Sequence, residues 1–209
     1  MSAYVIPLAI TMNAGPQIMS AIIFITAAKP LKLSAYFLAG VVIAVTAGLT
    51  ITYTLATVLG NSISLGDPSN SGSLGNIIQY LLVGLLAILA IKNFVNRETI
   101  EPPAWLGALQ NATPRTAFTT GLLLLSVFPS DFVILVTVGV NLAQNDASFL
   151  SVVAFVAATI FIAALPVLSY LLFGRRAERA MPKVRDWMNK NSWLVSIIVY
   201  VIFILLILA

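Results

Sequence analysis

The chain of 209 residues contains no cysteine and no histidine. Their absence excludes a thiol redox relay, metal sites built on thiolate or imidazole ligands, and Ser-His or Cys-His catalysis. An enzyme would have to rely on one isolated carboxylate, Asp131, with no paired acid or base beside it. We therefore expect a protein that is not an enzyme, with no catalytic residues, no cofactor and no metal site.

Charge is also scarce: 9% of the residues are charged and 60% are hydrophobic. A soluble surface needs roughly 25% charged residues, so most of this chain must face lipid or other helices. The net charge of +4 does not indicate nucleic acid. The basic residues lie in short loops beside apolar segments, where membrane orientation and anionic headgroups explain them.

Long apolar runs are present instead, and a run of about 20 residues can cross the hydrocarbon of a membrane as a helix. We expect no cleavable signal peptide, because the first run lacks a basic start and continues too far. The sequence predicts an all-α integral membrane protein in the cytoplasmic membrane, with six spans at roughly 4–27, 34–59, 76–95, 117–140, 148–173 and 193–209.

The gaps between these runs alternate between basic and free of Lys and Arg. The eleven basic residues are Lys29 and Lys32 in the first gap, Lys92, Arg97 and Arg115 around the third, and six between Arg175 and Lys190 in the fifth. The positive-inside bias then predicts that all three gaps face the cytoplasm and that both termini lie outside.

The two halves of the chain match when Pro16 is laid over Pro129, 113 residues later. Because each half has three spans, the second half is inverted in the membrane, an architecture shared by many transporters. We predict one membrane domain, 1–209, comprising a first repeat (1–95), an inner linker (96–116) and a second repeat (117–209).

The segment 175–190 within the second repeat combines basic residues with apolar residues at helical spacing. This pattern favours an amphipathic helix lying in the inner membrane interface, which Pro182 would break or bend. The alternative is a basic loop that only sets the topology.

Polar residues cluster around one proline in the first span and one in the fourth. A proline removes a backbone donor and frees carbonyls one turn earlier, and broken helices that meet near the midplane form the sites of inverted-repeat transporters. The alternative is two ordinary kinks, with the amides bonding neighbouring helices. The predicted substrate or ion pathway consists of Asn13, Pro16, Gln17, Ser126, Pro129, Ser130 and Asp131.

Asp131 is the only acidic residue well inside a predicted span, about 21 Å along the helix from Ala117 at 1.5 Å per residue. An ionised carboxylate near the bilayer centre costs about 2.5–3.5 kcal/mol, so it should face a wet cavity or a partner. Asp131 is therefore a candidate proton carrier or cation ligand. A shift of the helix that lets it reach the outer headgroups is the alternative.

Further residues are weaker pathway candidates: Thr46 and Thr50 in the second span, and Thr159 and Tyr170 in the fifth. The threonines of the second span form a stripe, but threonine hydroxyls commonly bond to carbonyls of their own helix. The stripe is therefore weak evidence. A ridge of Gly40, Ala44 and Gly48 suits close helix packing. The ridge fits packing within one chain or in a homodimer.

Several stretches resemble the lysine-exporter superfamily, and within it most closely the glycopeptidolipid- or sulfolipid-addressing family. They are Pro7–Pro16, Ala39–Gly40, Ser126–Pro129, Leu165–Gly174 and Arg185–Met188. The resemblance covers nearly the whole chain and implies a six-helix inverted repeat. It also implies a role in moving substrates across or out of the membrane, for this branch envelope lipids or glycolipids.

One departure concerns the fourth span, where Ser130 and Asp131 stand in place of the Asn-Pro-type residues expected around the proline. We expect an exporter of a lipid, glycolipid or small amphipathic solute that works by alternating access, with membrane lipids as its surroundings. The alternative is a non-transporting scaffold that serves an envelope-lipid export machinery through partner proteins.

Overall fold

The computed structural model describes residues 5–13, 15–62, 83–84, 87–88, 90–96, 105–127, 129–144, 149–191, 193–194, 197–198, 200–201 and 204–205. Every regular element within these residues is a helix, and none of them forms a strand. The predicted all-α class is therefore confirmed.

Two helices are long and apolar. They are α3 (Pro30–Ser62) and α8 (Phe149–Phe173), in the positions of the second and fifth predicted spans. Within the described residues they are the two helices long and apolar enough to cross a membrane, over Pro30–Val58 and Val152–Phe173. The total of six spans stays a prediction.

The first and fourth predicted spans are each divided into two helices. The first consists of α1 (Val5–Asn13) and α2 (Pro16–Ile25). The fourth consists of α6 (Pro114–Val127) and α7 (Pro129–Gln144). A proline at the first position of a helix loses no intrahelical bond and has a suitable φ, which is why α2, α3, α6 and α7 each begin at one. The prolines of these two spans therefore start helices rather than kink them.

The predicted third and sixth spans lie largely outside the described residues. Their described parts meet at one point, where the rings of Phe94 and Trp193 pack edge to face with centroids 5.8 Å apart. In the predicted linker 96–116, the short helix α5 (Trp105–Ala108) and the 3-10 turn η1 (Leu109–Asn111) pack against α2. The first contact joins the two flanking segments to each other, and the second ties the linker to α2 of the bundle.

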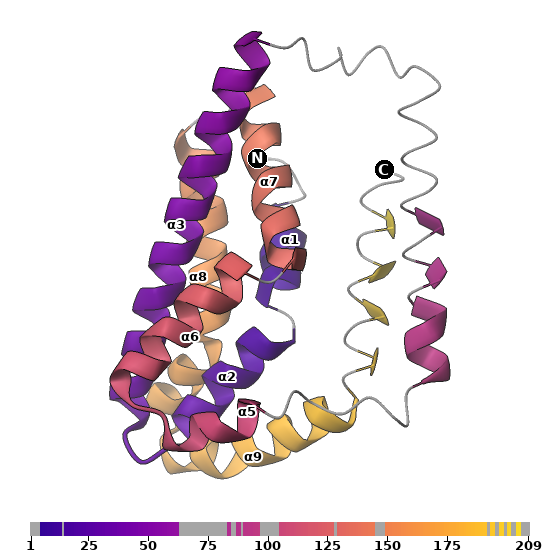
Figure 1. The fold of residues 1–209 in the computed structure, drawn as a ribbon. Helices are drawn as coiled ribbons and strands as arrows, with labels where there is room; N and C mark the ends of the chain where they lie inside the picture. Colours follow the sequence, from indigo (N-terminus) through magenta and orange to yellow (C-terminus); the bar gives the residue numbers. More distant parts are fainter. Residues whose placement is uncertain are drawn as a thin grey trace.

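The two long helices of the bundle have equivalent neighbours, because each packs against one of the two broken pairs. Helix α3 packs against α6 and α7, and α8 packs correspondingly against α1 and α2. Figure 1 shows that the chain descends through α1 and α2 and ascends through α6 and α7, so the two broken pairs run in opposite directions. Both breaks lie part-way along the length of α3 and α8.

Close backbone contact joins α3 to α6. A Cβ atom added to Gly40 would collide with the carbonyl oxygen of Phe118, and one added to Gly121 would collide with that of Phe37. The third member of the ridge, Gly48, faces Leu135 of α7, whose Cδ1 would lie 2.7 Å from an added Cβ. The predicted small-residue ridge therefore packs within the chain.

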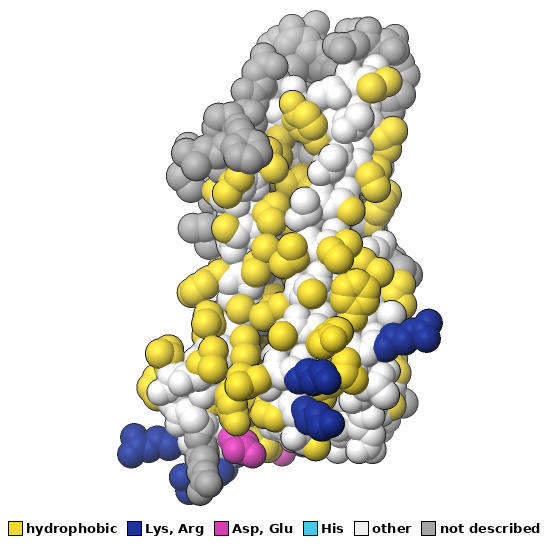
Figure 2. All heavy atoms as spheres, turned by 90° about the vertical axis from the view of Figure 1, so that its left-hand side faces the viewer, with side chains coloured by type: hydrophobic (Ala, Val, Ile, Leu, Met, Phe, Trp, Pro, Cys, Tyr) yellow, Lys and Arg dark blue, Asp and Glu magenta, His cyan; other side chains and the backbone are white. Residues whose placement is uncertain are grey.

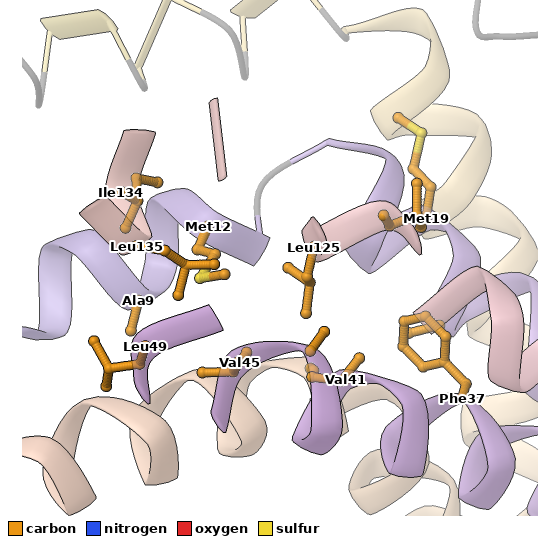
Figure 3. Packing of buried hydrophobic residues seen from close by; sticks show 14 of the residues in the cluster. Ala9, Met12, Met19, Phe37, Val41, Val45, Leu49, Leu125, Ile134 and Leu135 are labelled. Carbon is orange, nitrogen blue, oxygen red and sulfur yellow. The ribbon is translucent and has the colours of Figure 1, made fainter. Parts of the chain in front are cut away.

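A buried apolar cluster surrounds the breaks. Figure 3 shows Ala9 and Met12 of α1 beside Leu49 and Leu135, while Val41 of α3 faces α6. The outside of the bundle is apolar as well, with exposed α3 side chains that include Val42, Ile43, Ile51, Leu55 and Val58. Figure 2 shows this apolar face, with the basic side chains confined to its lower end.

Helix α9 (Arg175–Lys190) covers that lower end and crosses the bundle beneath α2 and α8 (Figure 1). It occupies the residues for which an amphipathic helix is predicted and continues through Pro182. Ala177 is buried, whereas Val184 and Trp187 are exposed. This combination of an attached face and an exposed basic and apolar face suits a helix at a membrane interface.

Candidate functional site

The site is built around the two helix breaks. Gly15, between α1 and α2, has φ of 92° and ψ of −133°, a conformation that a residue with a Cβ adopts only under strain. Pro16 and Pro129 have no N–H, so the carbonyl groups four residues earlier, on Met12 and Leu125, receive no helical hydrogen bond from them. Each break thus lacks one helical hydrogen bond inside an apolar bundle.

A side-chain hydrogen bond joins the two breaks. The amide Nε2 of Gln17, in the first turn of α2, donates to Oδ2 of Asp131, in the first turn of α7. Gln17 is 3% exposed and Asp131 is 1% exposed. Because these residues are 114 positions apart, the bond connects the two broken pairs directly.

Helix polarity contributes to this arrangement. The N-terminus of a helix carries a partial positive charge that stabilises a carboxylate in its first turn, by about 0.3–1 kcal/mol near a surface and more when partly buried. Asp131 occupies this position in α7. The same polarity makes the C-terminal carbonyls of α1 and α6 the negative ends at their breaks.

A second polar connection joins α1 to α8. Nδ2 of Asn13, the last residue of α1, lies 2.9 Å from the carbonyl oxygen of Ala9 and 3.2 Å from that of Thr159. The Thr159 hydroxyl donates to the carbonyl of Phe155, 2.9 Å away. Asn13 is 2% exposed and Thr159 is fully buried, so this connection also lies in the interior.

The amide of Gln17 keeps one unused atom. Its Oε1 is buried and has no hydrogen-bond partner. A Cβ placed on Gly15 would lie 3.8 Å from this oxygen, which locates Oε1 beside the first break. A buried acceptor without a partner costs free energy, so its presence at a helix break points to a ligand or a moving part.

The structure therefore joins four of the predicted pathway residues in two buried pairs, Gln17 with Asp131 and Asn13 with Thr159. Pro16 is half-buried at the first break. Ser126 is exposed on α6, and Tyr170 lies half-buried near the C-terminal end of α8. Pro129 and Ser130 begin α7, but their side chains lie outside the described part of the structure.

The threonine stripe of α3 does not face the buried polar residues. Thr46 and Thr50 are exposed, and the Thr50 hydroxyl donates to the carbonyl of Thr46, 2.7 Å away. Thr52, which the sequence argument does not single out, is the buried threonine of this helix. Its hydroxyl lies 3.0 Å from the carbonyl oxygen of Leu135 on α7. The only signal in the sequence is its position off the stripe, on the side of Leu49 and Val45.

The fold and the site together define a class: an all-α protein with two helices long and apolar enough to cross a membrane and a buried polar site at the breaks of two others. The family model described as Sap, sulfolipid-1-addressing protein, matches residues 5–209, and the chain belongs to this family. Membership suggests a role in lipid export or addressing, in agreement with the resemblance seen in the sequence. No curated protein and no solved structure matches the chain.

Proposed function

We propose that the chain transports a lipid, glycolipid or small amphipathic solute across the cytoplasmic membrane. One observation carries the proposal: helix breaks 113 residues apart in the sequence meet through the buried Gln17–Asp131 bond. A buried carboxylate in an apolar bundle is costly, and such residues commonly mark transport pathways. The family description supports a lipid as the substrate.

The transport mechanism we propose is alternating access between two inverted three-helix repeats, with both termini outside. Two observations support it: α3 and α8 each pack against one broken pair, and the two broken pairs run in opposite directions. In such folds one repeat rocks against the other around a central site, and half-helix ends supply its polar groups. Proton coupling through Asp131 and an absence of enzymatic activity are parts of the same proposal.

The decisive test is reconstitution of the purified full chain alone in vesicles. A fluorescent glycolipid placed in one leaflet is followed by its accessibility to a membrane-impermeant quencher. We expect the label to move between leaflets faster with the protein than in protein-free vesicles. Equal rates in the two preparations contradict the proposal.

A scaffold of an export machinery is the second candidate function. It is favoured by the exposed basic and apolar face of α9, where Trp187 is 55% exposed and free to contact a partner protein. Lipid movement that appears only after partner proteins are added to the vesicles identifies this role.

The topology gives a separate prediction. Because the chain has no cysteine, a single introduced thiol is the only one that can be labelled. We expect Lys183→Cys, on α9, to react with an impermeant maleimide only after the cells are permeabilised. Ser71→Cys, in the second gap, should react in intact cells. The reverse pattern contradicts the positive-inside orientation.

A further inference from the structure

The starting observation is the orphaned Oε1 of Gln17. The side chain is 3% exposed, its Nε2 is used by Asp131, and its Oε1 faces the first break with no protein partner. An amide that needed only to donate to a carboxylate would be equally well replaced by a hydroxyl. The unused carbonyl oxygen needs a separate explanation, and an oxygen with no donor nearby is available to bind a cation.

Two other oxygen groups belong to residues at this break. The carboxylate of Asp131 accepts from Nε2 of the same amide. The carbonyl of Met12, a fully buried residue near the end of α1, receives no hydrogen bond from Pro16. All of these groups are hard oxygen donors, which select alkali and alkaline-earth cations rather than transition metals.

We propose that the first break binds one monovalent alkali cation of the Na⁺ class. Its ligands are Oε1 of Gln17, the carboxylate of Asp131 and the main-chain carbonyl of Met12. One carboxylate balances a single positive charge. Divalent cations generally require several acidic ligands, and no group of three His, Cys, Asp or Glu residues occurs among the described residues.

The two faces of the Gln17 amide explain how the site exists with and without the cation. Without it, Nε2 donates to Asp131 and holds α2 against α7. With the cation bound, Nε2 keeps this bond, and Oε1, which points to the first break, binds the cation together with the carboxylate. Cation binding therefore adds a bridge between the two broken pairs to their direct contact. The coupling of this bridge to transport rests on the proposed function, whereas binding itself does not.

The experiment uses the purified full chain in lipid nanodiscs, titrated with NaCl against choline chloride at constant ionic strength. Binding to the folded state raises Tm by an amount that grows with the logarithm of the Na⁺ concentration above Kd. We expect a Na⁺-specific rise of about 5 °C and saturable binding of about one ²²Na⁺ per chain. Equal Tm values in the two salts, together with no saturable ²²Na⁺ binding, overturn the proposal.

Matched variants locate the cation. Asp131→Asn and Gln17→Met should lose the Na⁺-specific Tm rise. Gln17→Glu keeps an oxygen and adds a charge, so it should bind Na⁺ at least as tightly as the wild type. The controls are Asp186→Asn on α9 and Gln110→Met in η1, both exposed side chains, which should keep the wild-type response.

If one of the site variants does not fold, the wild-type titration and Gln17→Glu still decide the matter. A Na⁺ response that persists in Asp131→Asn places the cation elsewhere and overturns this site. Transport without Na⁺ binding contradicts the cation proposal alone. Na⁺ binding without transport contradicts the proposed function alone.

Discussion

Asp131→Asn should reduce lipid movement in reconstituted vesicles at least tenfold, equivalent to about 1.4 kcal/mol in the activation free energy. Asparagine has nearly the same shape, so it can remain beside Gln17 in the interior. It cannot carry a negative charge or accept and release a proton at this position. The variant should therefore lose the pH dependence that the wild-type rate shows, as well as most of the rate itself.

Two measurements separate this effect from misfolding. Far-UV circular dichroism and size-exclusion behaviour of Asp131→Asn should match the wild type. Asp186→Asn, on the exposed surface of α9, makes the same chemical change outside the bundle and should transport at the wild-type rate. A variant at Asp131 that moves lipid at the wild-type rate with unchanged pH dependence would show that this carboxylate takes no part in transport.

The helical class and the breaks could be predicted because they depend on local chemistry. Apolar runs of membrane-spanning length leave few alternatives to helix, and Pro16 and Pro129 cannot donate the hydrogen bond that a continuous helix requires. The broken helices predicted at the two prolines correspond to the separate helices α1 and α2, and α6 and α7. At the first break Gly15, with φ of 92°, turns the chain where proline alone would only bend it.

The contacts inside the site could not be predicted, because they depend on how helices rotate about their axes. The polar character of Gln17 and Asp131 was visible, but their hydrogen bond requires a register between α2 and α7 that no local pattern encodes. The same limitation explains the α3 threonines. Thr46 and Thr50 form the obvious stripe, yet packing against α6 and α7 turns Thr52 inward instead.

The contact between α3 and α6 gives the second large prediction. Gly40→Ala and Gly121→Ala should each destabilise the protein by about 3 kcal/mol, the upper end of the usual range for overpacking. An added methyl group at either position meets main-chain atoms of the facing helix, which cannot rotate away as a side chain can. Besides the Phe118 carbonyl, the backbone nitrogen of Leu122 would lie 2.8 Å from a Cβ on Gly40. The helices must therefore separate, and the contacts around them weaken together.

Thermal unfolding in detergent, followed by tryptophan fluorescence, measures this effect, and about 3 kcal/mol corresponds to a fall in Tm of about 6–12 °C. Gly107→Ala is the matched control, because a Cβ there meets nothing within 4 Å, and its Tm should stay close to that of the wild type. The double variant should lose less than the sum of the single losses, since the first methyl group already separates the same two helices. Wild-type Tm values for both single variants would mean that α3 and α6 do not approach each other this closely in the folded protein.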